Sequence, residues 1–207
     1  MRFVSLGSGS RGNATLVEAQ GTRVLLDCGF PAREAEQRLN AAGVDPATLD
    51  AVLVTHEHRD HLRGVGALAR RHRLPVYMTA GTRRAGRCGA LEVIGTLDPH
   101  GGALCIGDLR AQPLAVPHDA CEPVQFVLEA GGLKLGVLTD TGRITPYILE
   151  SLIGCDALIL ECNHDSRLLA EGPYPPALKA RVGGPLGHLS NDQAAALLGC
   201  LDHGRLR

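Results

Sequence analysis

The feature that most constrains this chain is a dense run of potential metal ligands placed directly after an apolar segment. The run HEHRDH at residues 56–61 holds three histidines and one aspartate within six residues. It follows AVLVT at residues 51–55, a short apolar stretch typical of a buried strand. A solvated polar turn is the alternative interpretation, but it does not account for four ligand-type side chains at one strand end.

The spacing within this run predicts two metal ions. In an extended chain alternate side chains face the same way about 6–7 Å apart, so His56 and His58 can converge on one ion. If the chain then turns into a helix, Asp60 and His61 are directed towards a second ion. Imidazole suits zinc and related metals, and a carboxylate also draws in harder ions such as manganese. We therefore expect a centre of two divalent ions, zinc or manganese.

Three residues that follow other apolar runs are expected to complete this centre. His118 joins the existing histidines, although a lone histidine at a strand end is usually structural. Asp140 could bridge two ions with its two carboxylate oxygens, or it could simply form a turn before a Thr-Gly pair. Asp27 could orient a ligand histidine, with a simple turn before Gly29 as the alternative interpretation.

Apolar periodicity along the chain predicts a layered α/β fold. Short apolar runs predict strands at residues 2–6, 14–18, 22–26, 51–55, 76–78, 109–116, 124–128, 133–138 and 157–160. Helical patterns cover residues 32–42, 62–72, 145–153 and 191–201, the last behind a Ser190 N-cap. Because helices occur between hairpin-like strand pairs, we expect a four-layer αββα sandwich and not a parallel βαβ array. A length of 207 residues suits one such domain, residues 1–207.

Composition narrows the classes of protein that this chain can be. With 26 glycines and 12 prolines, much of the chain must turn between short elements. The seven cysteines lack CxxC spacing, which favours reduced thiols in a cytosolic protein. No signal peptide is recognisable and no apolar run approaches the ~20 residues of a membrane span, so we expect a cytoplasmic protein without membrane contact. The formal net charge of −1 means that any phosphate-binding surface must be local.

Residues 171–187 differ from the rest of the chain. This segment carries four prolines and several glycines, and it is too long for an ordinary connection. Such segments are usually lids or linkers, so we expect a functional loop here.

The order of these motifs resembles that of the metallo-β-lactamase superfamily. HxHxDH followed by a distant histidine and then a distant aspartate identifies only the superfamily. Within it, the chain is similar to the YycJ/WalJ-like group from residue 3 to about residue 200. The motifs that carry this similarity are SGSRGN (8–13), THEHRDH (55–61), HDA (118–120), TDTG (139–142), ECNHD (161–165), YP (174–175), LKAR (178–181) and GHLSN (187–191). ECNHD and GHLSN are the most specific of them.

The resemblance implies a cytoplasmic nuclease, in its best-known form a 5′-to-3′ DNA exonuclease. It implies one metal held by His56, His58 and His118, and a second held by Asp60, His61 and Asp140.

The chain also departs from the pattern of this group. Members of the group continue past the last helix into a further strand, which ends in a second His-Leu-Ser and supplies the last metal ligand. This chain ends at Arg207, where that strand should begin. We therefore expect a fragment lacking its last strand, with His188 as a replacement ligand in the alternative case. His203, in a polar tail, is interpreted as a surface residue.

Hydrolysis at a two-metal centre suggests catalytic roles for three residues. Two ions about 3.5–4 Å apart lower the pKa of a bound water to roughly 7. Asp60 could orient this water or take its proton. The leaving alkoxide needs a proton or positive charge, which His188 or His164 could supply. For both histidines a buried structural role is the alternative.

Contacts to phosphate are expected from two parts of the chain. The first part is residues 7–12, a glycine-rich loop whose N–H groups could make an anion nest, with Arg11 beside it. The second part is the proline-rich segment 171–187, which carries Lys179 and Arg181. The expected substrate-binding residues are Ser8, Ser10, Asn13, Lys179 and Arg181. Tyr174 could stack on a terminal base or pack in the core. Three further arginines are interpreted as a solvated face: Arg83, Arg84 and Arg87.

We therefore predict a two-metal-dependent hydrolase of phosphodiester bonds, with nucleic acid as its substrate and DNA preferred over RNA. One alternative is a hydrolase of small esters or thioesters, because the same centre serves that chemistry. Another is an inactive, metal-binding fragment. A flavodiiron-type redox protein is excluded, since it would carry glutamate in place of His58. The oligomeric state does not follow from the sequence.

Overall fold

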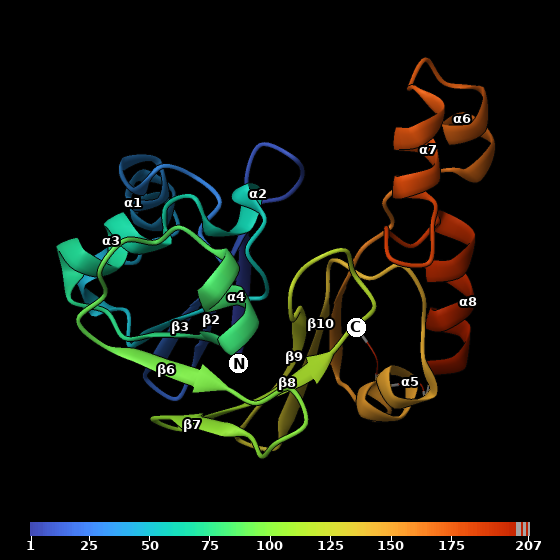
Figure 1. Ribbon diagram of the computed structural model, residues 1–207. Coiled ribbons are helices and arrows are strands. Elements are labelled where there is room, and N and C mark those ends of the chain that lie inside the picture. The colour runs from blue at the N-terminus through green and yellow to red at the C-terminus, as the bar shows by residue number, and fades with distance from the viewer. Residues whose placement is uncertain (202–203, 205, 207) are drawn as a thin grey trace.

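Two β-sheets packed face to face form the centre of the molecule, and helices cover their outer faces (Figure 1). The computed structural model describes all residues except 202–203, 205 and 207, so the interpretation of His203 lies outside the described residues. Helices α1 (Ala32–Ala41) and α3 (Val65–His72) cover the first sheet, while α5 (Pro146–Leu152) and α8 (Asn191–Leu201) cover the second. The predicted four-layer αββα sandwich is confirmed.

The first sheet has six strands in the order β1-β2-β3-β4-β5-β6 and the second has five in the order β11-β10-β9-β8-β7. The strands of the first sheet are β1 (Arg2–Gly7), β2 (Ala14–Ala19), β3 (Thr22–Leu26), β4 (Ala51–Leu53), β5 (Val76–Thr79) and β6 (Ile94–Leu97). Those of the second are β7 (Leu104–Ile106), β8 (Leu109–Ala115), β9 (Val124–Ala130), β10 (Leu133–Leu138) and β11 (Ala157–Leu160). The remaining helices are η1 (Pro46–Thr48), α2 (Arg59–Leu62), α4 (Ala80–Ala85), α6 (Ser166–Glu171) and α7 (Pro176–Val182).

Parallel pairing aligns the ends of the strands that precede candidate ligands. In the first sheet β3 and β4 run parallel with Leu26 opposite Leu53, so the segments that follow both strands leave the same edge. In the second sheet β10 and β11 run parallel with Leu138 opposite Leu160. The edges of the two sheets therefore deliver polar segments from four strand ends.

Strand β4 contributes side chains to the hydrophobic cores on both of its faces. Ala51 and Leu53 point into the core between the two sheets, whereas Val52 points into the core beneath α1 and α3, which Val54 just after the strand also enters. Alternate side chains of a strand face opposite ways, and a strand covered on both faces is therefore apolar throughout. A third core lies between the second sheet and the helices α5 and α8.

The predicted helix at 62–72 is wrong at its beginning. The structure has two separate helices, α2 and α3, which meet at Gly64. The Gly64 N–H donates to the Cys28 carbonyl at 2.7 Å, and a Cβ on Gly64 would lie only 2.0 Å from the Phe30 carbonyl oxygen. Close approach of this segment to residues 28–30 therefore breaks the helix. The short strands β6 and β7 were not predicted; β6 contains Gly95, buries only Leu97 and lies at a sheet edge.

The prediction of a loop over 171–187 is wrong in its middle, because Pro176–Val182 form helix α7. Pro175 is the N-cap of that helix and Pro176 is its first residue, where a missing N–H removes no helical hydrogen bond. With α6 it forms a helical hairpin that projects from the body of the molecule and has no buried residue (Figure 1).

The helix α8 begins as predicted. Gln193 N–H donates to Ser190 Oγ at 3.2 Å, and Ser190 N–H donates back to Gln193 Oε1 at 2.8 Å, which is a capping box. No helix in the described part of the chain has the length and apolar character needed to cross a membrane.

Candidate metal centre

Five candidate ligands converge where the edges of the two sheets meet. They form two groups of three side chains, and within each group one ligand atom of every side chain lies within 4.8 Å of the ligand atoms of the other two. The groups found among the described residues are His56, His58 and His118, and His56, His61 and Asp140. The structure thus brings together residues from the ends of β4, β8 and β10, which are up to 84 positions apart in the chain.

The second group differs from the set implied by the sequence resemblance. His61 Nε2 lies 3.4 Å from Asp140 Oδ2, but 3.7 Å from Asp60 Oδ2. Asp60 therefore adjoins the group without belonging to it, and His56 is shared by both groups.

His56 and His61 are oriented by one buried carboxylate, Asp27. Asp27 accepts hydrogen bonds from His61 Nδ1, Thr55 N and Thr55 Oγ1, each at 2.8 Å. Thr55 Oγ1 in turn lies 2.9 Å from His56 Nδ1 and accepts from it. These bonds fix both rings so that their Nε2 atoms point towards the ligand groups, the usual arrangement behind a metal-bound histidine. Asp27 adopts φ 60°, a left-handed conformation that aspartate tolerates better than most residues.

His58 and His118 are fixed by backbone carbonyls in the same way. His58 Nε2 donates to the Asp119 carbonyl at 3.2 Å, and His118 Nδ1 donates to the Gly187 carbonyl at 3.0 Å. The inward atoms, His58 Nδ1 and His118 Nε2, are 3.3 Å apart.

The residues present fit divalent metal ions. The buried Nε2 atom of His56 has no hydrogen-bond partner among the described residues, although a buried polar atom is normally satisfied. Burial and the neighbouring histidines His61, His118 and His58 hold the pKa of His56 well below its usual value, which keeps a lone pair available. Burial opposes protonation of His61, yet Asp27, Asp140 and Asp60 raise its pKa to about 9. Four imidazoles and a carboxylate are ligands that suit zinc or manganese.

His188 lies beside these groups on the side of Asp140. Its Nδ1 donates to Glu161 Oε2 at 2.9 Å and lies 3.7 Å from Asp140 Oδ1. Burial lowers the pKa of His188, but the hydrogen bond and charge of Glu161 outweigh it and raise the pKa. Glu161 also accepts from Thr141 N at 2.7 Å, and burial raises its pKa despite these donors. The sequence singled out the motif around Glu161 but gave this residue no role.

Asp119 is a second residue that sequence reasoning missed. It follows His118 directly, and its Oδ1 lies 3.5 Å from His118 Nε2 and 3.6 Å from His58 Nε2. Its other oxygen accepts a hydrogen bond from Arg181 Nε. Burial raises the pKa of Asp119, but Arg181 and His118 lower it overall.

Asp60 is held by the glycine-rich loop. Asn13 Nδ2 lies 3.2 Å from Asp60 Oδ2 and 3.0 Å from His61 Nε2, and Asn13 N–H donates to the Asp60 carbonyl at 2.7 Å. Gly29 allows this approach, because a Cβ there would lie 1.7 Å from the Asp60 carbonyl oxygen. Asn13 therefore contacts the centre directly.

Two cavities adjoin the centre. One, of about 400 Å³, is lined by Ser8, Ser10 and Asn13 together with Asp60 and His188. The other, of about 240 Å³, opens between the histidines and α7 and is lined by Arg181, Leu178 and Ser10 as well as His58 and His118.

The remaining expected residues lie elsewhere. His164 lines neither cavity; it forms a bridge to Ser190, and its buried Nδ1 has no hydrogen-bond partner in the described structure. Lys179 Nζ donates to the Ala170 carbonyl at 2.6 Å within the helical hairpin and lines neither cavity. Tyr174 is 54% exposed on that hairpin, so the core-packing interpretation is wrong.

Comparisons with known proteins identify the family of this chain. Residues 22–206 match the family described as Beta-lactamase superfamily domain. The chain is 33% identical over 202 residues to an exodeoxyribonuclease YycJ of Bacillus anthracis, a match that covers 94% of this chain and 75% of that protein. It is 35% identical over 198 residues to a ribonuclease Z of Pyrobaculum neutrophilum, a match that covers 85% of this chain and 67% of that protein. The crystal structure of the metallo-β-lactamase fold protein YhfI from Bacillus subtilis superposes on this chain with a TM-score of 0.76 at 18% sequence identity. The superposition covers 96% of this chain and 81% of the YhfI chain.

Proposed function

Because this chain belongs to the β-lactamase superfamily, and within it resembles the YycJ/WalJ exonucleases along nearly its whole length, we propose that it is a 5′-to-3′ DNA exonuclease. It is a metal-dependent hydrolase of the metallo-β-lactamase fold, and its substrate class is the phosphodiester bond. The observation that carries the proposal is the convergence of four histidines and Asp140 at one place, at the edge of open cavities.

We assign each ion to a distinct set of ligands. Zinc or manganese would be held at one position by His56, His58 and His118, and at the other by Asp60, His61 and Asp140. When bound, two such ions supply a water molecule with a pKa of roughly 7 and positive charge for the phosphate oxygens. The support for the second set is that His61 lies within 3.7 Å of both carboxylates.

Asp60 is the residue that we assign to the attacking water. Its side chain is 32% exposed and reaches both cavities, so one oxygen can contact water while the other contacts Asn13. A carboxylate in this position orients the water and accepts its proton as the water oxygen bonds to phosphorus.

His188 is the residue that we assign to the leaving oxygen. As the phosphorus–oxygen bond breaks, that oxygen gains negative charge, and a protonated imidazole can donate a proton to it. Glu161 favours the protonated form and fixes the ring, which makes Glu161 a positioning residue. His188 is preferred to His164 because only His188 lines the cavities beside the centre.

DNA is preferred to RNA as the substrate. The match to the exodeoxyribonuclease covers 94% of this chain, whereas the match to the ribonuclease Z covers 85%. Contacts to the strand are assigned to Ser8, Ser10, Asn13 and Arg181, which line the cavities. Lys179 lies within the hairpin and would contact the DNA only if the DNA strand extends beyond α7.

We further propose a single domain over residues 1–207 and a cytoplasmic location. The support for this location is that six cysteines, at positions 28, 88, 105, 121, 162 and 200, are free thiols, as expected where disulfides are rare. The expectation of a further strand and histidine after Arg207 stays a prediction.

The test uses protein loaded with manganese or zinc on DNA labelled at either end, on RNA and on a thioester panel. We expect mononucleotide release from the 5′ end of DNA. His58→Ala should remove this activity and lower the metal content by about one ion, while circular dichroism stays unchanged. Thioester hydrolysis without nucleotide release would replace this proposal by the small-ester alternative, and preferential RNA cleavage would correct the substrate.

A further inference from the structure

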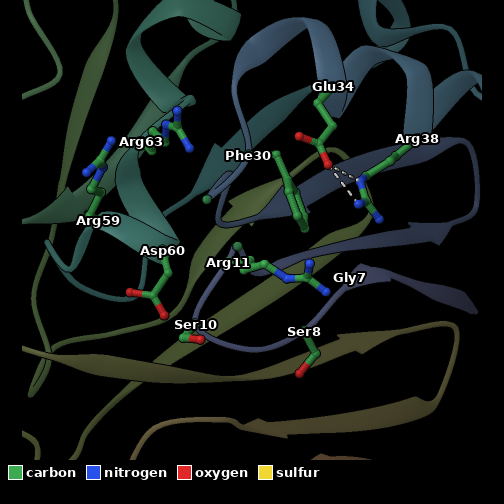
Figure 2. A pocket seen from close by; sticks show the side chains of 12 residues that line it. Gly7, Ser8, Ser10, Arg11, Phe30, Glu34, Arg38, Arg59, Asp60 and Arg63 are labelled. Carbon is green, nitrogen blue, oxygen red and sulfur yellow. Dashed lines mark hydrogen bonds and ion pairs between the residues drawn. The ribbon is translucent and has the colours of Figure 1, made fainter.

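A larger cavity, of about 780 Å³, lies beside the metal centre between the glycine-rich loop, α1 and α2 (Figure 2). Its charged lining residues are four arginines and two acidic residues: Arg11, Arg38, Arg59, Arg63, Glu34 and Asp60. The whole chain has a net charge of −1, so this excess of positive charge is local.

One arginine and one acidic residue form a wall of the cavity. Arg38 donates to Glu34 Oε1 through Nη2 at 2.8 Å and to the Leu6 carbonyl through Nη1 at 2.6 Å. Its guanidinium also stacks on the Phe30 ring at 4.1 Å from the ring centre. Arg38 is therefore already engaged and serves to shape the cavity.

The other three arginines have no such partners. The side chains of Arg11, Arg59 and Arg63 are exposed, and their guanidinium groups form no hydrogen bond or ion pair with any residue that the structure describes. Like charges that line one cavity repel each other, and a bound anion removes that repulsion. The guanidinium group is suited to phosphate, because its N–H groups match two phosphate oxygens at once.

The loop that carries Arg11 is fixed against the cavity wall. A Cβ on Gly7 would lie 2.5 Å from the Phe30 ring, and one on Gly12 would lie 2.7 Å from it. Only glycines allow the loop to pack this closely on Phe30. Arg11 thereby lines the cavity together with Ser8 and Ser10, all of them labelled in Figure 2.

The cavity shares lining residues with the cavities of the metal centre. Asp60 and Ser10 line it, and the same two residues line both cavities beside the histidines. A ligand that extends past Asp60 therefore reaches both regions.

We propose that this arginine pocket binds a phosphate group of the substrate strand other than the one that is hydrolysed. The inference rests on the proposed function, which places the hydrolysed phosphate at the histidines. The ligand chemistry is a phosphate ester, which is either the terminal monoester of the strand or an internal diester. The pocket sets the strand's position relative to the metal centre.

The test compares two variants of equal charge. The pocket variant carries Arg11→Gln, Arg59→Gln and Arg63→Gln. The matched control carries Arg2→Gln, Arg73→Gln and Arg110→Gln, which are exposed and do not line the pocket. Both are assayed on short single-stranded DNA with a 5′-phosphate or a 5′-hydroxyl, and on bis(p-nitrophenyl) phosphate, which has a single phosphate.

The pocket variant should raise the KM for DNA at least tenfold, because each charge-assisted contact contributes about that factor. Turnover of bis(p-nitrophenyl) phosphate and the metal content should match the control. A rise in KM confined to 5′-phosphorylated DNA identifies the terminal monoester as the ligand. An equal rise in KM for DNA with a 5′-phosphate and DNA with a 5′-hydroxyl identifies an internal diester. Equal KM values for pocket variant and control, or an equal loss on the small diester, would overturn the inference.

Binding separates this inference from the proposed function. Fluorescence anisotropy of 3′-labelled DNA in EDTA needs no catalysis, so it reports on the pocket even if the wild-type chain cleaves no DNA. Weaker binding by the pocket variant than by the control supports the pocket, and equal binding rejects it.

Discussion

The metal centre and the α6–α7 hairpin flank the same cavity but are built in opposite ways. In the centre, His56, His61 and Asp27 are buried and bonded to one another through Thr55. In the hairpin no residue is buried, and Leu168 is 70% exposed. Its contacts with the residues around the centre include the ion pair from Arg181 to Asp119 and the hydrogen bond from the His188 N–H to the Val182 carbonyl.

This difference assigns different tasks to the two regions. A buried network of hydrogen bonds behind the ligand histidines holds their ligand atoms in one geometry, as metal binding requires. A helical pair without a core contributes little to global stability and opens at low free-energy cost. The centre therefore determines the chemistry, and the hairpin can adapt to what lies in the cavity.

The largest effect is expected where the buried network is broken. In metal-free protein, Asp27→Ala leaves the raised-pKa imidazole of His61 without its main partner and should cost about 3–5 kcal/mol of unfolding free energy in urea. Asp27→Asn, which keeps the volume and tolerates the left-handed backbone, should cost less. A loss below about 1 kcal/mol for Asp27→Ala would contradict the role given to this network.

The same variant gives a pH dependence. A folded pKa of about 9 for His61 means that its contribution is complete below the unfolded pKa and is lost as the pH rises through about 9. The stability difference between wild type and Asp27→Ala should therefore be largest below about pH 6.5 and should shrink towards pH 9 and above. A difference that grows with pH would have the wrong sign.

A large effect on activity, without loss of metal, is expected at His188. His188→Ala should lower turnover by ~10²–10⁴-fold at saturating metal, since it removes a proton donor. Calorimetric titration should show the same number of metal-binding events as in the wild type. Loss of one event would show that His188 is a ligand.

An intermediate effect is expected in the core beneath α1. Leu39 is fully buried there, so Leu39→Ala should cost about 2–5 kcal/mol of unfolding free energy.

The smallest effect is expected from the same substitution in the hairpin. Leu168→Ala should change stability by no more than about 0.5 kcal/mol, because the side chain is mostly exposed. If both leucine variants lose comparable stability, the hairpin packs more tightly than its exposure indicates, and the contrast between the two regions fails.

The sequence by itself determined the local part of the site. His56, His58, Asp60 and His61 are neighbours in the chain, so the end of strand β4 brings them together whatever the remaining fold. The period of apolar residues likewise predicted most strands and helices and the αββα layers. These patterns are readable because they depend on interactions within a few residues.

Only the tertiary structure determined which side chains from distant parts of the chain contact the site residues. Asp27 reaches His61 because β3 and β4 pair in parallel with aligned ends, and Glu161 reaches His188 because the GHLSN segment returns to the end of β11. Arg11 joins Arg59 and Arg63 only because the glycine-rich loop packs on Phe30. Such pairs are separated by tens of residues, and their distances depend on strand register and sheet packing. No periodicity along the chain encodes those quantities, so the partners appear only in the folded molecule.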